Sequence, residues 1–292
     1  MILKIDSVSK KAKKDILINN LSAEFVPGIY GILGGEFSGK TALANIISGL
    51  SYPDSGTVVF DDGEKIGNIC EMKSFTGYAS GKYGYYENFT VYEFLKYVAV
   101  LKGVSKKKIK EKINEIIYKT DLVEHSHKLI YKLSAYAKRC LGIAQAIINN
   151  PKVLIFDNPT SGLNNEEKVR IRNIIPEISR DKIVIIFTEI VSDIEYLAEK
   201  IYFMEKGKIF LKGTKEDITR LSEGHVWKCL TGEDMIDFYE RRYKVSYKRS
   251  THDFYELRVV AEDKPDSYAV LTEPDFYDSC LYFFSGGKIE FN

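Results

Sequence analysis

A glycine-rich segment between a strand and a helix constrains the fold of this chain more than any other feature. Residues 28–33 (GIYGIL) have the composition of a strand, residues 34–41 (GGEFSGKT) fit the spacing G-x4-G-K-[ST], and residues 41–50 have helical spacing. In such a loop, backbone N–H groups and the N-terminus of the following helix hold phosphate oxygens. This order of elements predicts an α/β fold with a phosphate-binding loop.

The residue types in this loop suit phosphate chemistry. The backbone N–H groups point inward, Lys40 is placed to bridge the outer phosphates, and Thr41 offers its hydroxyl to Mg²⁺. We therefore expect the whole loop to contact the ligand. Its candidate binding residues are Gly34, Gly35, Glu36, Phe37, Ser38, Gly39, Lys40 and Thr41.

Two later apolar runs predict a parallel, doubly wound sheet. Residues 153–157 (VLIFD) and 183–187 (IVIIF) are buried-strand signals, and the helical segment 165–179 lies between them. Strand, helix and strand in this order are typical of parallel strands with helices on both faces. A mostly helical stretch at 91–150 precedes them, and we interpret its basic run KKKIKEK as a solvated helix face.

The character of the sequence changes after the glycine-bearing turn region at 206–213. From about residue 222 onward the chain is rich in tyrosine, with short strand-like pieces around one helical segment at 233–243. This mixture predicts a small α+β domain. Its predicted strands are residues 225–230, 243–249, 254–261, 268–273 and 281–284.

Composition excludes several classes of function. With 42 Lys and Arg against 41 Asp and Glu, the net charge is +1, so no overall field attracts nucleic acid, and we expect no nucleic-acid partner. The four cysteines have no zinc-site spacing. The apolar runs stop well short of the ~20 residues that cross a bilayer, so in any membrane complex another chain must do the spanning.

Four segments resemble the ABC ATPases in order and spacing. The loop at 34–41 is followed by KLSAYAKRCLGIAQAIINNP at 132–151, DNPTSGLN at 157–164 and FTEIVSDIEYLAEKIYFMEKGKI at 187–209. Such collinearity is much more specific than any one motif. The resemblance implies a P-loop NTPase fold of the ABC ATPase type, with ATP and Mg²⁺ as cofactors.

The resemblance also implies a domain organisation. It covers residues 1–215, where we expect the ABC-type nucleotide-binding domain with a helical subdomain at about 82–150. Residues 222–292, expected to form a C-terminal α+β accessory domain, contain TEPDFYDSCLYFF and more weakly resemble the extension of bacterial exporter ATPase subunits. Such subunits dock on transmembrane permease subunits that are separate chains. The expected location is therefore cytoplasmic, peripheral on the inner face of the cell membrane, and the expected direction of transport is export.

The catalytic positions of the family are altered in this sequence. Asp157 stands where the family has the aspartate of the Mg²⁺ shell, and it is the second candidate metal ligand after Thr41. Asn158 occupies the position of the glutamate that activates water, and an amide accepts no proton at neutral pH. Glu189 falls at the position of the histidine that contacts the γ-phosphate, where a carboxylate repels the nucleotide. No catalytic residue is therefore expected to be intact.

Three further positions depart from the family. Gly81 aligns with the glutamine that senses the metal, and Ala12 aligns with the aromatic residue that stacks on adenine. Phe37 stands where the family has glycine in the phosphate loop. If that position needs a positive φ, a bulky residue costs roughly 1–3 kcal/mol there.

The motif that the family presents to its dimer partner is altered as well. The family's LSGGQ reads Leu-Ser-Ala-Tyr-Ala at 133–137. Ser134 is retained and is a candidate contact for the partner's nucleotide, whereas Tyr136 replaces a glycine and is expected to block close approach. Asn164 replaces the aspartate that follows Ser-Gly-Leu.

These changes predict a catalytically degenerate subunit. ABC ATPases form head-to-tail dimers in which each site joins one chain's phosphate loop to the other chain's LSGGQ motif, so a homodimer would have two inactive sites. We expect a heterodimer in which this chain binds ATP weakly or without hydrolysis and an active second ABC ATPase subunit supplies the chemistry.

Two alternatives stay open for the function. The chain is a functional ATPase that recruits a substitute base, or it is a non-catalytic regulatory or scaffold protein that no longer binds ATP. A soluble or translation-associated ABC protein is disfavoured, because those carry two ATPase modules and this chain has one phosphate loop. The aromatic segment 83–89 (YGYYENF) is either a docking surface for a transmembrane subunit or internal packing.

Overall fold

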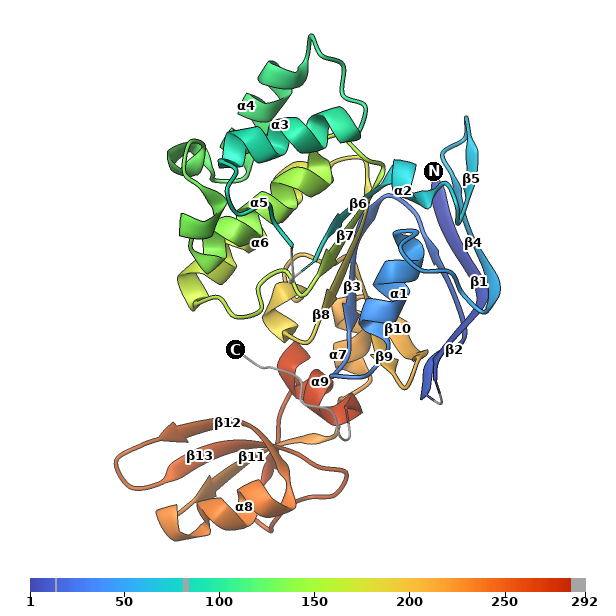
Figure 1. Ribbon diagram of the computed structural model, residues 1–292. Coiled ribbons are helices and arrows are strands. Elements are labelled where there is room, and N and C mark those ends of the chain that lie inside the picture. Colours follow the sequence, from blue (N-terminus) through green and yellow to red (C-terminus); the bar gives the residue numbers. More distant parts are fainter. Residues whose placement is uncertain (14, 81–83, 285–292) are drawn as a thin grey trace. The chain divides into compact units, whose positions relative to one another are not determined.

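The computed structural model describes residues 1–13, 15–80 and 84–284, which form two compact units (Figure 1). The first unit ends at Leu211 and the second begins at Lys212. This boundary lies inside strand β10 (Lys208–Gly213). Helix α7 (Lys215–Arg220) therefore belongs to the second unit. The domain ranges expected from the sequence, 1–215 and 222–292, left this helix outside the C-terminal domain.

The first unit is built on a six-stranded sheet in the order β10-β9-β3-β8-β7-β6. Strand β3 pairs in parallel with β8 and β9, and β7 pairs in parallel with β6 and β8. Every residue of β7 and β8 is buried, as their apolar runs predicted. The strands are β3 (Gly28–Leu33), β6 (Thr76–Ala79), β7 (Val153–Asp157), β8 (Ile183–Thr188) and β9 (Lys200–Glu205).

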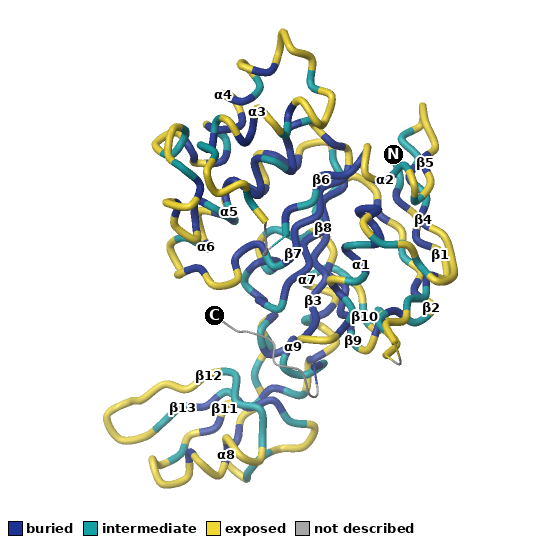
Figure 2. The backbone as a smooth tube through the Cα atoms, in the orientation of Figure 1, coloured by how far each residue is buried: buried dark blue, intermediate teal, exposed yellow. Residues whose placement is uncertain are grey.

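A second sheet of the first unit is antiparallel, in the order β2-β1-β4-β5. Helix α1 (Lys40–Ile47) lies between the two sheets in Figure 1, and Figure 2 shows the buried backbone concentrated along the strands of the six-stranded sheet. Leu43 and Phe60 belong to the core that joins these elements. The remaining elements here are β1 (Ile2–Ala12), β2 (Asp15–Phe25), β4 (Ser55–Asp61), β5 (Ile66–Asn68) and the short α2 (Met72–Phe75).

The stretch 91–150 of the first unit is mostly helical, as the sequence predicted. Helix α5 packs against β6 and carries Ser134 at its N-cap. Helix α6 begins after Asn164, whose side chain forms a capping box with Glu167. Asn164 thus has a helix-capping role in this chain. The four helices are α3 (Val91–Leu101), α4 (Ile109–Lys119), α5 (Ala135–Ile147) and α6 (Asn165–Ser179).

The second unit is a four-stranded sheet in the order β12-β13-β11-β14, with a core around Cys229, Leu257 and Val259. Helix α8 contacts β12, and α9 contacts α7, β12 and β13. The strand expected at 268–273 shrinks to two residues. The elements are β11 (Val226–Thr231), α8 (Ile236–Arg242), β12 (Lys244–Ser250), β13 (Tyr255–Val260), β14 (Val270–Leu271) and α9 (Phe276–Phe283).

The strand predicted at 281–284 is wrong, because most of that segment is the end of α9. The side chain of Asp275 accepts from the backbone N–H of Asp278, and the Asp278 side chain accepts from the backbone N–H of Asp275. This capping box starts a helix that outweighs the strand preference of the aromatic residues that follow.

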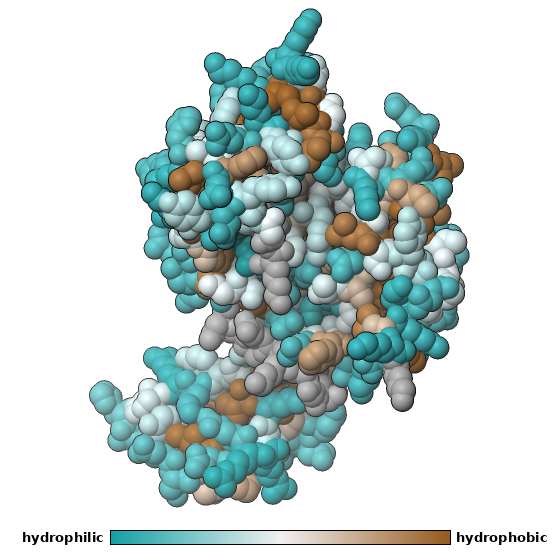
Figure 3. All heavy atoms as spheres, viewed as in Figure 1, coloured by the Kyte–Doolittle hydropathy of each residue, from teal (hydrophilic) through white to brown (hydrophobic). Residues whose placement is uncertain are grey.

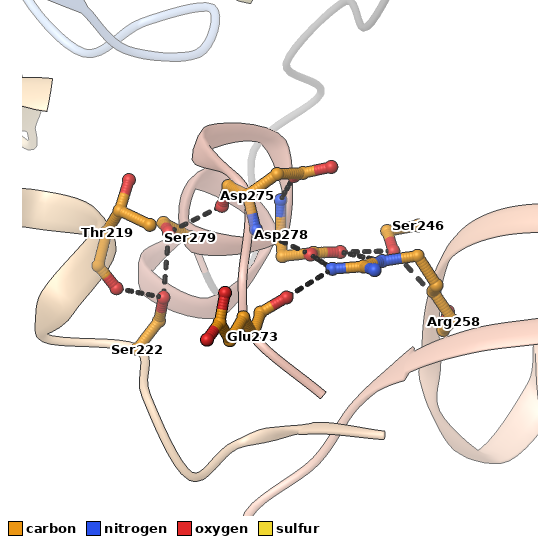
Figure 4. Close-up of polar contacts among 8 residues, drawn as sticks. All are labelled: Thr219, Ser222, Ser246, Arg258, Glu273, Asp275, Asp278 and Ser279. Carbon is orange, nitrogen blue, oxygen red and sulfur yellow. Dashed lines mark hydrogen bonds and ion pairs between the residues drawn. The ribbon is translucent and has the colours of Figure 1, made fainter. Parts of the chain in front are cut away.

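Asp278 also ties α9 to the sheet of the second unit (Figure 4). Its carboxylate is fully buried and accepts from Arg258 on β13 and from Ser246 on β12. Nearby, the hydroxyls of Ser279 and Ser222 lie 2.7 Å apart and join α9 to the segment after α7. The polar cluster therefore fixes the position of α9 within this unit.

Candidate nucleotide-binding site

The loop of residues 34–41 joins the end of β3 to the start of α1, as the sequence predicted. Gly39 has φ of 99°, and a Cβ there would lie 2.2 Å from the carbonyl oxygen of Leu17, so only glycine fits. The α1 N-cap, Gly39, makes no side-chain capping bond, which leaves the first N–H groups of the helix available. This arrangement of N–H groups suits a phosphate anion.

Phe37 lies at the exposed tip of the loop. Its φ is 63°, which lies in the left-handed region, and the family's glycine at this position had suggested such a conformation. Its side chain is 90% exposed. A non-glycine residue costs roughly 1–2 kcal/mol in this conformation. Because the ring is largely exposed, it makes few packing contacts that could offset this conformational cost.

Lys40 is buried and its amine is already surrounded by acceptors. The Nζ atom donates to the carbonyl oxygens of Gly34 at 2.5 Å and Gly35 at 2.8 Å, and to Ser38 Oγ at 3.2 Å. It also forms an ion pair with Glu189, with Nζ 3.4 Å from Oε1. Burial lowers the pKa of Lys40 below its ordinary value, and the charge of Glu189 opposes that shift.

The sheet register explains why Glu189 meets the loop. Leu33 and Thr188 are paired across the parallel strands β3 and β8. Gly34 and Glu189 are the next residues along each strand, so both leave the sheet at its carboxyl edge. The structure thus brings together Lys40 and the residue that the sequence placed at the switch histidine position.

Asp157 closes the other side of the loop at the end of β7. It is 5% exposed, and its Oδ2 accepts a hydrogen bond from the Tyr78 hydroxyl at 3.1 Å. Its Oδ1 is buried and accepts no hydrogen bond from any residue that the structure describes. Burial raises the pKa of Asp157, and hydrogen bonds from Tyr78 and Thr41 partly oppose this. An unpartnered carboxylate oxygen near the Thr41 hydroxyl fits the oxygen-ligand preference of Mg²⁺.

Asn158 follows Asp157 in the left-handed conformation, with φ of 50°. Asparagine tolerates this conformation better than most residues. The backbone N–H of Asn158 donates to the carbonyl oxygen of Phe187 at 2.7 Å, and its own carbonyl accepts from Arg139 at 2.9 Å. The backbone position is therefore well fixed, while the side chain offers an amide where hydrolysis needs a base.

The loop forms one wall of a cavity of about 780 Å³. Lys40, Thr41 and Glu189 line it, and Ile16 and Leu17 of β2 supply apolar surface. Ala12, expected at the adenine-stacking position, is exposed at the end of β1 and is absent from the residues that line the cavity. The apolar lining therefore consists of the aliphatic side chains of Ile16 and Leu17 and the ring of Phe37 in the loop, and the aromatic residue that the family has at position 12 is missing.

Tyr136 is buried next to the exposed Ser134, and the expectation that it blocks the partner's close approach stays a prediction. Its side chain is 7% exposed, and its hydroxyl donates to Asp121 at 2.7 Å. Ser134 and Ala135 remain exposed, and the Ser134 hydroxyl accepts from the N–H of Ala137 as the N-cap of α5. The tyrosine has become part of the buried packing of the helical region.

Several contributors to the site were missed in the sequence. Tyr78 is the penultimate residue of β6, which pairs in parallel with β7. The carboxyl ends of neighbouring parallel strands meet at one edge of a sheet, so the Tyr78 hydroxyl could have been expected near Asp157. Arg139 also donates to the carbonyl of Ser161 at 2.9 Å. The buried Asp193 accepts from Thr160 at 2.6 Å and Thr188 at 2.9 Å, and no sequence motif signalled it.

Two expectations concern the segment before α3. Gly81 lies outside the described residues, as does the first residue of 83–89. Tyr85 is half-buried, and its hydroxyl donates to the carbonyl of Lys138 at 2.6 Å. Tyr86 is 54% exposed, and its ring centroid lies 5.4 Å from that of Phe89 and 5.5 Å from that of Tyr97. One tyrosine of the segment therefore packs internally and another remains accessible.

No helix in the described ranges is long and apolar enough to cross a membrane.

Comparison with known proteins places this geometry in a family. The ABC transporter family profile matches residues 18–161. The lantibiotic transport ATP-binding protein SrtF of Streptococcus pyogenes is 31% identical over 231 residues, covering 76% of this chain and 95% of SrtF. The uncharacterized ABC transporter ATP-binding protein YxlF of Bacillus subtilis is 28% identical over 260 residues, covering 88% of this chain and 86% of YxlF.

Solved structures share the fold of the first unit. The dimeric structure of MJ0796, a bacterial ABC transporter cassette, has a TM-score of 0.64 and 20% identity over 73% of this chain and 98% of the cassette. MJ0796 is also known in a post-hydrolysis state bound to ADP and Pi. ATPase domains of this type bind ATP or ADP, and such subunits generally dimerise and work with permease components. This chain belongs to the ABC transporter ATP-binding family.

Proposed function

We propose that this chain is the nucleotide-binding subunit of an ABC transporter and that it binds ATP weakly or without hydrolysing it. One observation carries the proposal. The phosphate loop with Lys40 is intact and faces the carboxylate of Asp157, while Asn158 and Glu189 occupy the positions that need a base and a histidine. Removing one preorganised transition-state group costs about 10² to 10³ in rate, so the loss of two leaves little hydrolysis.

The residues that remain suit binding. Thr41 and Asp157 would hold Mg²⁺, and the Tyr78 hydroxyl orients the Asp157 carboxylate through its hydrogen bond. The cation would neutralise phosphate charge when it is bound. The N–H groups of the loop and the N-terminus of α1 would hold the phosphates, and Ile16 would contact the base.

The complex that we propose contains an active second ABC ATPase subunit and separate transmembrane permease subunits, and it drives export. The chain would lie on the cytoplasmic, inner face of the cell membrane. The exposed Ser134 supports a contribution to the partner's nucleotide site, since its hydroxyl and the N-terminus of α5 are accessible. The name of SrtF, a lantibiotic transport protein, supports a role in transport.

We further propose that the exposed face of α3 is the docking surface for a transmembrane subunit. Tyr97, Val100 and Leu101 are 39%, 54% and 67% exposed, and Tyr86 packs against Tyr97. Figure 3 shows hydrophobic residues gathered over α3 and α4. Aromatic and aliphatic side chains grouped in this way are typical of interface cores.

Affinity purification from native membranes tests the proposal. The chain is expected to co-purify with a multi-span membrane protein and a second ATPase chain. Substituting Tyr97→Glu and Leu101→Glu together should remove the membrane protein from the preparation, whereas Tyr268→Glu, on an 85% exposed tyrosine of the second unit, should not. Recovery of the unaltered chain without partners would refute a transporter subunit.

A further inference from the structure

The anion site of the phosphate loop contains a carboxylate of the protein itself. Glu189 lines the same cavity as Lys40, its side chain is 27% exposed, and its Oε1 lies 3.4 Å from Lys40 Nζ. In a phosphate loop the lysine reaches the outer phosphates of a nucleotide. The carboxylate of Glu189 is therefore paired with the cation that a third phosphate would need.

The charges around Lys40 make this pairing hard to displace. Glu189 forms an ion pair with its amine, and the charges of Asp157 and Glu36 also act on this buried cation. The other lysine that lines the cavity, Lys10, is held by Asp54 at 3.0 Å and by the carbonyl of Tyr52 at 2.7 Å. Each further phosphate on the ligand adds negative charge to a site that already has an excess of it.

The remaining anion-binding groups serve a shorter ligand better. The N–H groups of the loop and the N-terminus of α1 hold phosphates without help from Glu189. A diphosphate can use these groups while Lys40 keeps its ion pair. A triphosphate must bring its terminal phosphate to the place where the Glu189 carboxylate meets Lys40.

From this juxtaposition we infer that Glu189 makes the site selective for a nucleoside diphosphate over the corresponding triphosphate. The inference rests on the proposed nucleotide-binding function and adds the class of ligand. Glu189 acts as an internal substitute for the terminal phosphate and so holds the site in a diphosphate-binding state. At equal concentrations of the two nucleotides, the diphosphate complex is then the principal form.

Calorimetric titration of the full chain with Mg-ADP and with Mg-ATP tests this selectivity. We expect ADP to bind at least about tenfold more tightly than ATP, which corresponds to 1.4 kcal/mol. Glu189→Gln removes the charge and keeps the size of the side chain, so ATP should tighten about tenfold while ADP changes little. Glu189→Ala gives a second variant, and melting curves without nucleotide check that both variants fold.

Glu205→Gln is the matched control, because Glu205 ends β9 at the same edge of the sheet and is absent from the residues that line the cavity. It should leave the ratio of the two affinities unchanged. Equal affinities for the two nucleotides, or a ratio that Glu189→Gln leaves unchanged, would overturn the selectivity and leave nucleotide binding standing. Failure of the unaltered chain and both Glu189 variants to bind either nucleotide would instead overturn the proposed function itself.

Discussion

At the tip of the phosphate loop, a residue with a large side chain adopts a conformation that favours glycine. Phe37 has φ of 63° and is 90% exposed. Phe37→Gly should therefore raise the free energy of unfolding by about 1 kcal/mol, since relief of roughly 1–2 kcal/mol of strain exceeds the entropy that glycine adds to the unfolded chain. Urea denaturation checks this. Phe37→Ala keeps a Cβ and should give no such gain, and an equal gain in both variants would contradict the strain argument.

A half-buried lysine, Lys182, gives the first unit a specific pH dependence. Burial, helped by the charges of Lys112 and Lys152, lowers the pKa of Lys182 from 10.5 to about 8. Between these values the unfolded chain binds more protons at this residue than the folded chain, so stability rises with pH. Relative to Lys182→Gln, the unaltered protein should gain stability from about pH 7.5 to about pH 9.5 in urea denaturation. A difference that stays constant would show that the lysine is not perturbed.

Within the site, the sequence predicted individual residues better than it predicted the contacts between them. The strand, loop and helix order placed Lys40 and Thr41, and collinearity with the family placed Asn158 and Glu189. The ion pair between Glu189 and Lys40 was not predicted, because it depends on the register between β3 and β8. Periodicity along one strand carries no information on that register.

At the scale of elements, continuous apolar runs were predicted well and mixed aromatic segments were not. Strands β7 and β8 and helix α6 have the predicted bounds to within one residue. Residues 281–284 were assigned to a strand from their aromatic composition, although they follow a capping box that starts α9. Aromatic residues fit buried surfaces of helices as well as strands, so a capping motif is the stronger local signal.

The attachment of α9 provides a prediction for the second unit. Asp278 is fully buried and pairs with Arg258 (Figure 4), so Asp278→Ala leaves a guanidinium without its partner and should destabilise this unit by about 3–5 kcal/mol. Hydrogen exchange of the full chain should show lost protection in β12 and β13, and unchanged protection in β7 and β8. Replacing both partners with leucine should restore part of the protection. Full protection in the Asp278→Ala variant would refute this role.

At the scale of the whole molecule, the sequence predicted the α/β class, the parallel sheet and a separate C-terminal α+β region. The boundary between the units, after Leu211, falls within the glycine-bearing region 206–213 where the sequence changes character, and α7 packs against α9 within the second unit. The alignment with YxlF spans 260 residues and therefore extends past the first unit. At least part of the second unit is thus included in the similarity to YxlF.

The central claim is that the chain keeps a phosphate-binding loop and lacks the groups for hydrolysis. The most direct test incubates the purified chain with Mg-ATP labelled on its terminal phosphate and then separates the bound nucleotide from the products. The account predicts that the bound ATP is recovered intact and that phosphate release stays at the level of a protein-free control. Phosphate release at an ordinary enzymatic rate of about 1 per second, abolished by Lys40→Ala, would contradict it.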